Sequence, residues 1–232
     1  MSYFDYSSHN GTECRLGFSL KRYHPANGTD DFTEGDETPD ASGAYLFKPM
    51  KGDMNKHPYS QFKSIRAFTG DIVSAFVLQY ASEDASEIYT AIIRLTRGSG
   101  LLEFEVNMHG IPVSENKGKE IVANWEVVDF ENDGVFYTDS NGLEMQKRVL
   151  DQRPGWTLET DERQSSNYYP VQQAIAIRDR NTQVTVMNDR SQGGSVLSAG
   201  SIELMQDRRL LFDDSRGLNQ PLNEVNELGV GI

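Results

Sequence analysis

Cysteine is almost missing from this sequence: its 232 residues contain one, Cys14. A single thiol cannot build an internal disulfide framework or a multi-cysteine zinc module. We expect Cys14 to be a free thiol. The alternative is a bond to a second chain or to another part of a longer protein.

Long apolar runs are also missing. The best stretch, 72–78, is interrupted by Ser74, whereas a membrane-spanning helix needs about 18 or more apolar residues. The first residues lack the basic and apolar regions of a secretory signal. We therefore expect no membrane partner and no targeting signal within this chain. Asn10 and Asn27 each begin an Asn-Gly-Thr glycosylation pattern, which is a mild indication of a secretory protein.

Positive charge is scarce, with 22 Lys and Arg against 35 Asp and Glu and a formal net charge of −13. Nucleic acids and anionic membranes reward basic surfaces, so this balance argues against both as partners. With 37% hydrophobic and 10% aromatic residues, the composition is that of a folded chain, large enough for one large or two small domains.

Metal-binding spacings are absent as well. The four histidines are scattered singly, and zinc needs three or four convergent ligands. Two carboxylates can hydrolyse a glycoside, and 35 acids always supply pairs, but nothing in the sequence selects one pair. Residues 28–41 form an acidic segment, which we interpret as a surface loop extended by like charges. A calcium loop is the alternative, although its spacing fits no EF-hand.

Strand patterns dominate what is present. Residues 102–108 alternate apolar and polar residues, 121–128 place apolar residues on one parity, and 87–97 are apolar on both parities. Such periods of two predict antiparallel strands, some covered on both faces. Turn sequences recur at intervals of roughly 8–12 residues, and no helix of three turns is evident. We predict an all-β, antiparallel sandwich.

The densest polar stretch lies near the C-terminus, at 188–195, 202–211 and 213–217. In a strand, Arg208 and Arg209 point to opposite faces. One of them shares the face of Met205 and needs a carboxylate or a ligand as partner. The structural interpretation is an Arg–Asp network that pins the loop before Asp213, and the functional one is an arginine presented to a polyhydroxylated substrate.

These stretches belong to a series of sequence blocks along the chain. The blocks are 42–47 (Ser-Gly-Ala-Tyr-Leu-Phe), 118–120, 136–142, 167–171, 188–194 (Asn-Asp-Arg-Ser-Gln-Gly-Gly), 202–209 (Ile-Glu-Leu-Met-Gln-Asp-Arg-Arg), 213–217 (Asp-Asp-Ser-Arg-Gly) and 221–224. In sequence and in order, over about residues 42–224, they resemble the signature blocks of the glycoside hydrolase family 38 α-mannosidases.

This resemblance implies that residues 1–232 are the C-terminal β region of an α-mannosidase, with a supersandwich like that of galactose mutarotase. The complete family enzyme removes terminal α-mannose from N-glycan oligosaccharides with retention of configuration. Its zinc and its catalytic carboxylates lie in an N-terminal domain, which is not in these residues, and the last strands of the β region are expected to be missing too. The chain alone is then inactive, its partners are an α-mannoside and that N-terminal domain, and its compartment is the lysosome, vacuole or secretory pathway.

By motif position, the resemblance implies that Tyr45 and either Arg208 or Arg209, preferably Arg208, reach the sugar. For Tyr45 the alternative is an aromatic packed between sheets. Structural roles are expected for the remaining motif residues. Gly193 and Gly194 are interpreted as a turn that needs positive φ, and Asp213 and Asp214 as acceptors of loop amides or of Arg216; Asp189 and Arg190 belong to the same structural set.

The residues are also compatible with another class of function, a stand-alone carbohydrate-binding or structural β-sandwich without catalysis. An exposed row of aromatics would indicate such a module. The only tryptophans, Trp125 and Trp156, are interpreted instead as core or inter-domain contacts.

Overall fold

The computed structural model describes residues 2–7, 13–28, 40–50, 57–81, 87–113, 116–158 and 162–225. Within these ranges it contains fifteen β-strands and one four-residue helix, α1 (Arg163–Ser166). Every strand pairing is antiparallel. The predicted all-β, antiparallel architecture is confirmed. The more specific likeness to galactose mutarotase stays a prediction.

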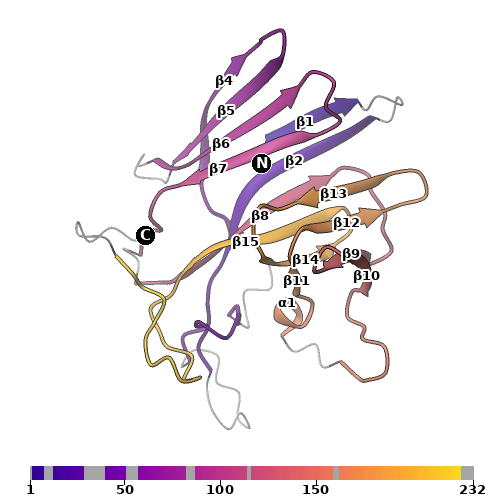
Figure 1. The fold of residues 1–232 in the computed structure, drawn as a ribbon. Helices are drawn as coiled ribbons and strands as arrows, with labels where there is room; N and C mark the ends of the chain where they lie inside the picture. Colours follow the sequence, from indigo (N-terminus) through magenta and orange to yellow (C-terminus); the bar gives the residue numbers. More distant parts are fainter. Residues whose placement is uncertain are drawn as a thin grey trace.

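The largest sheet, which we call the central sheet, has seven strands in the order β1-β2-β8-β15-β14-β11, with β3 also pairing with β2 (Figure 1). Its strands are β1 (Ser2–Ser7), β2 (Glu13–Tyr23), β3 (His57–Pro58), β8 (Lys119–Val127), β11 (Tyr169–Val171), β14 (Gln192–Ser198) and β15 (Ser201–Arg209). The middle strand β8 has paired neighbours on both sides, and all but one of its residues are buried. Its polar residues are therefore enclosed.

Two four-stranded sheets accompany the central sheet (Figure 1). One has the order β4-β5-β6-β7, with β4 (Gln61–Phe68), β5 (Val73–Ala81), β6 (Glu87–Thr96) and β7 (Leu102–Met108). The other has the order β10-β9-β12-β13, with β9 (Val135–Ser140), β10 (Glu144–Val149), β12 (Ala174–Arg178) and β13 (Gln183–Met187). The alternation predicted for 102–108 is confirmed, because the apolar residues of β7 are half-buried and its polar residues are exposed.

The hydrophobic core joins all three sheets. Phe18 of β2 packs against Phe104 of β7 and Trp125 of β8, with ring centroids 5.2 and 5.5 Å apart. Ile175 and Ile177 of β12 belong to the same buried cluster. The two small sheets thus cover one face of the central sheet, which we call the core face. The strand parity of 121–127 predicted this apolar face.

Several residues that the sequence analysis singled out are placed by the structure, and others lie outside the described ranges. Trp125 is buried, as expected, but Trp156 is 66% exposed and lies near the guanidinium of Arg153. Cys14 is a free, half-buried thiol, and burial raises its pKa. The acidic segment lies almost wholly at residues outside the described ranges, as does Asn10. No helix in the described part of the chain could cross a membrane.

Candidate functional site

The segment that carries Tyr45 is held by one buried carboxylate. Asp214 accepts hydrogen bonds through Oδ2 from the backbone N–H groups of Tyr45 (2.6 Å) and Leu46 (3.1 Å), and through Oδ1 from that of Arg216 (3.1 Å). Burial raises the pKa of Asp214, but the three N–H donors outweigh it and leave the pKa lowered. The Tyr45 ring is nevertheless 66% exposed. The structure therefore fixes the backbone of Tyr45 while its side chain stays accessible.

Gly43 explains why a glycine precedes Tyr45 in this block. A Cβ at position 43 would lie 2.5 Å from Cβ and 2.6 Å from Cγ of Asp214. Side chains do not approach that closely, so any larger residue would separate the segment from its carboxylate. The absence of a side chain at Gly43 is what allows Asp214 to reach the amides of Tyr45 and Leu46.

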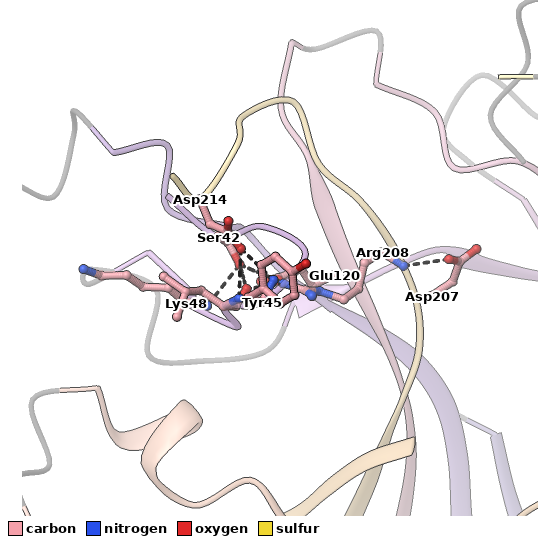
Figure 2. Close-up of polar contacts among 8 residues, drawn as sticks. Ser42, Tyr45, Lys48, Glu120, Asp207, Arg208 and Asp214 are labelled. Atoms are coloured by element: carbon pink, nitrogen blue, oxygen red, sulfur yellow. Dashed lines mark hydrogen bonds and ion pairs between the residues drawn. The ribbon is translucent and has the colours of Figure 1, made fainter. Parts of the chain in front are cut away.

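Arg208 supports the same segment from the central sheet (Figure 2). Its Nε and Nη2 donate to Oε1 of Glu120 on β8, at 3.0 and 2.7 Å, and Nη2 also donates to the carbonyl of Leu46 at 2.5 Å. Ser42 joins this cluster by donating from Oγ to Glu120 Oε1 (2.7 Å) and accepting from the backbone N–H of Lys48 (3.0 Å). We call Ser42, Glu120, Arg208 and Asp214 the clamp.

Burial dominates the electrostatics of the clamp. The Glu120 side chain is fully buried, and that of Arg208 is 14% exposed. Burial raises the pKa of Glu120, and the charge of Arg208 and the hydroxyl of Ser42 oppose that rise. A buried ion pair needs such additional hydrogen bonds to offset the loss of solvation. Three of them are made by the pair here: Ser42 Oγ donates to Glu120, and Arg208 Nη2 donates to Ser42 Oγ and to the Leu46 carbonyl. The pair therefore orders the segment rather than standing alone.

A β-bulge decides which arginine reaches the clamp. Met205 faces Val122 across the β15–β8 pair, but Asp207 faces Ile121 and Arg208 faces Glu120. The extra residue shifts the alternation, so Arg208 shares the face of Met205, whereas regular alternation assigns that face to Arg209. Cross-strand partners lie on one face, and this face is opposite to the core face. The partner of Arg208 is a glutamate on the neighbouring strand rather than the aspartate of the predicted Arg–Asp network.

Arg209 has a different environment. Its Nε donates to Oδ1 of Asn223 at 2.8 Å, and its Nη1 donates to the carbonyl of Ile111 at 2.6 Å. Arg209 is 9% exposed. Its contacts therefore tie β15 to two loops, and they do not include the Tyr45 segment.

A second buried carboxylate beneath the segment was not singled out from the sequence. Glu203 Oε1 accepts hydrogen bonds from the hydroxyls of Tyr23 (2.9 Å) and Tyr168 (2.5 Å). Burial and the neighbouring Glu203 raise the pKa of Tyr168 well above its usual range. The Tyr168 ring packs on Phe47, with centroids 4.5 Å apart. The available signal was that Tyr168, Glu203 and Phe47 all lie in the resemblance blocks.

The prediction of a positive-φ turn at Gly193 and Gly194 is wrong. Both lie within strand β14, and neither is among the residues with positive φ. Added Cβ atoms would lie 3.1 Å from the Tyr168 ring at Gly193, and 2.7 Å from Leu204 Cδ2 and 2.8 Å from Val171 Cγ2 at Gly194. Close packing rather than backbone conformation therefore accounts for these glycines, and it is tighter at Gly194 than at Gly193.

The other motif residues do not join the clamp through their side chains. Asp189 and Arg190 form an exposed ion pair with each other. Asp213 accepts the backbone N–H groups of Ser215 (2.9 Å) and Gln220 (3.1 Å), and so shapes its own loop. The guanidinium of Arg216 binds Asp40 at 2.6 Å.

The clamp has too few ligands for a zinc ion. Within the residues that the structure describes, no three His, Cys, Asp or Glu side chains come close enough together to hold a metal ion. The clamp itself offers two carboxylates. Asp214 accepts protein donors on both oxygens and Glu120 on Oε1 only, while the buried Oε2 of Glu120 has no hydrogen-bond partner among the described residues. Two carboxylates are fewer than the three or four ligands that zinc needs. These residues do not fit a zinc site.

Comparison with known proteins agrees with the resemblance blocks. Residues 11–216 match the model of the glycosyl hydrolases family 38 C-terminal domain. The chain belongs to this family. Among its relatives, a lysosomal alpha-mannosidase of Mus musculus is 42% identical over 191 residues, which is 82% of this chain and 18% of the relative.

More distant relatives cover more of the chain. A lysosomal alpha-mannosidase of Dictyostelium discoideum is 34% identical over 209 residues, 89% of this chain and 19% of the relative. An alpha-mannosidase of Canavalia ensiformis is 32% identical over 219 residues, 94% of this chain and 21% of the relative. The family 38 chain therefore spans about a fifth of the length of these relatives. All the clamp residues lie within the 11–216 match.

Proposed function

We propose that this family 38 chain supplies one wall of an α-mannoside site, which an N-terminal catalytic part of an α-mannosidase completes. In this role Tyr45 contacts the sugar, and the clamp holds Tyr45 in position. Hydrolysis of terminal α-mannose in N-glycan oligosaccharides is then the work of the completed site, with zinc bound by the catalytic part. The lysosome, named for the mouse and Dictyostelium relatives, is the proposed compartment.

The observation that carries this proposal is the presentation of Tyr45. Its backbone N–H is bound by a buried carboxylate, whereas its ring is 66% exposed. A surface tyrosine does not need a fixed backbone for stability. A tyrosine that must meet a sugar gains from one, because a fixed backbone leaves only the side-chain torsions to be ordered on binding. The phenol hydroxyl can donate to or accept from a sugar hydroxyl, and the ring offers an apolar face.

Arg208 rather than Arg209 is assigned to the site. Arg208 bonds directly to the Tyr45 segment through the Leu46 carbonyl, whereas Arg209 is bound to Ile111 and Asn223. Three of the five N–H donors of Arg208, on Nε and Nη2, serve Glu120, Ser42 and Leu46. Nη1 has no hydrogen-bond partner among the described residues, so it is the part of Arg208 that we propose to face the substrate.

The test is a chimera in which this chain replaces the matched segment of the mouse lysosomal α-mannosidase. We expect the chimera to hydrolyse a chromogenic α-mannoside. Tyr45→Phe should lower kcat/KM by about two- to tenfold, because one hydrogen bond between neutral groups contributes about 0.5–1.5 kcal/mol. Tyr45→Ala should lower it further, since it also removes the ring.

Leu143→Ala is the control, because Leu143 is a similarly exposed apolar side chain on the β9–β10 turn. It should leave kcat/KM unchanged. Equal kcat/KM for the chimera and its Tyr45→Ala variant would refute the proposed role of Tyr45.

A further inference from the structure

An open groove separates the two small sheets. It encloses about 720 Å³ between β7 and β13, and residues of β2, β8 and β15 form its floor. None of the clamp residues lines it, and neither does Tyr45. The groove is thus separate from the proposed sugar site, and an inference about it does not depend on the role of Tyr45.

Both walls of the groove are edge strands. β7 ends the order β4-β5-β6-β7, and β13 ends the order β10-β9-β12-β13. An edge strand directs a row of N–H and C=O groups away from its only neighbour, which makes it a template for another strand. In the described part of the chain, no strand pairs with the outer edge of β7 or β13. Two such edges therefore face one groove.

The floor and walls are apolar and incompletely covered. Phe104 of β7 packs on Trp125, with ring centroids 6.0 Å apart, yet Phe104 remains half-buried. Val106 of β7 and Val184 and Val186 of β13 are also only partly buried, although they pack against the core. All of these side chains line the groove. The core of the sandwich is thus open along the line between the two edges.

We infer that this groove binds an extended β-strand, supplied by α-mannosidase polypeptide outside the matched segment. Main-chain groups at the edges need an extended backbone as partner, which neither a sugar nor a helix provides. The apolar floor requires apolar side chains at every second position of that strand. The matched segment is 18% of the mouse relative, so most of that polypeptide is available to supply it.

Charge specifies the outer face of the bound strand. Glu103 and Glu105 of β7 are exposed on the side away from the floor, and Glu105 pairs with Arg94 at 2.7 Å. Opposite charges on neighbouring strands attract across a sheet. A strand with Lys or Arg on its outward positions matches this edge. Binding would join the two small sheets into one continuous sheet over the core face.

The chain contains two reporters for a binding experiment. Trp125 and Cys14 both line the groove, and Cys14 is the only cysteine. The Trp156→Phe variant leaves Trp125 as the only tryptophan. The probes are overlapping 15-residue synthetic peptides that cover the mouse relative outside its matched segment. We expect one contiguous set of peptides to change the intensity of the Trp125 emission and to slow the reaction of Cys14 with a thiol reagent at least tenfold.

Two controls separate strand pairing from general hydrophobic contact. The binding peptide, N-methylated at alternate residues, keeps its side chains but loses N–H donors, so both signals should disappear. Val186→Lys places a charge in the groove and should abolish binding, whereas Leu143→Lys, outside the groove, should not. If Val186→Lys fails to fold, the N-methylated peptide still decides.

Three results would overturn the inference. In the first, no peptide of the set protects Cys14. In the second, the N-methylated peptide binds as well as its parent. In the third, the chain forms a dimer in which Cys14 is already protected, which would make a second copy the occupant.

Discussion

Asp214→Asn is the most informative single change for the clamp. Asp214 is 1% exposed and accepts three backbone N–H groups, two on Oδ2 and one on Oδ1. Asparagine has the same shape but only one accepting oxygen. If that oxygen replaces Oδ2, it still accepts the N–H groups of Tyr45 and Leu46. The side-chain amide nitrogen then takes the place of Oδ1, and because it is a donor it cannot accept the N–H of Arg216.

The cost follows from this count. A hydrogen bond to a charged group contributes about 1.5–3 kcal/mol, and one between neutral groups about 0.5–1.5 kcal/mol. Asp214→Asn removes one charge-assisted bond, so we expect the free energy of unfolding to fall by at least about 1.5–3 kcal/mol, and the weakening of the other two bonds adds to that loss. Asp213→Asn is the matched control, because Asp213 accepts only two N–H groups at an exposed loop, and it should cost less than about 1 kcal/mol.

Urea unfolding at several pH values measures both changes. The pKa of Asp214 is lower in the folded state than in the unfolded chain, where a carboxyl of this type titrates near about 3.9. Its contribution is therefore complete above that value and is lost as the pH falls through the folded pKa. The difference between wild type and Asp214→Asn should shrink below about pH 4, because a protonated carboxyl resembles the amide. A difference that stays constant with pH, or that equals the control, would refute this reasoning.

Three further changes test the packing around the site, each by urea unfolding. Gly194→Ala should destabilise by about 1–3 kcal/mol through overpacking, since its Cβ would meet two side chains within 2.8 Å, whereas Gly100→Ala meets nothing and should stay within about 0.5 kcal/mol. Asp139→Asn should cost about 1.5–3 kcal/mol, because Asp139 accepts four backbone N–H groups and one of them would lose its acceptor. Glu120→Leu should lower the free energy of unfolding by about 3–5 kcal/mol, because it leaves the buried charge of Arg208 without a partner. Adding Arg208→Met should recover most of that loss. No recovery would show that the broken ion pair is not the cause of the destabilisation.

Much of the fold was predictable from local sequence patterns. The alternation over 102–108 predicted β7, and the apolar residues on both parities over 87–97 predicted β6. These signals are local because side-chain direction alternates along every strand. The central sheet was less predictable in detail, since its order joins β2, β8 and β15 from distant parts of the chain.

Local sequence patterns did not predict the geometry of the clamp. Regular alternation assigns the face of Met205 to Arg209, and one bulged residue in β15 gives it to Arg208 instead. The clamp joins Ser42, Glu120 and Asp214 across distant stretches of sequence. No periodicity encodes such contacts. Only the order of the family blocks indicated that they belong together.

Glycine was misinterpreted for a physical reason. Gly193 and Gly194 suggested a turn because glycine tolerates positive φ. In the structure, the missing side chains at these positions allow the Tyr168 ring and Leu204 to pack closely against the strand β14. A sequence shows that a side chain is absent but not which neighbour fills the space.

The central claim is that this chain contributes a wall of the sugar site, whereas the catalytic groups lie in another part of the enzyme. The most direct test is the rate at which the 232-residue chain alone hydrolyses a chromogenic α-mannoside in the presence of Zn²⁺, measured beside the mouse chimera. We predict turnover by the chimera and a rate equal to the blank for the chain alone. Zinc-dependent turnover by the chain alone would contradict the account, because it would place the metal and the catalytic carboxylates within these residues.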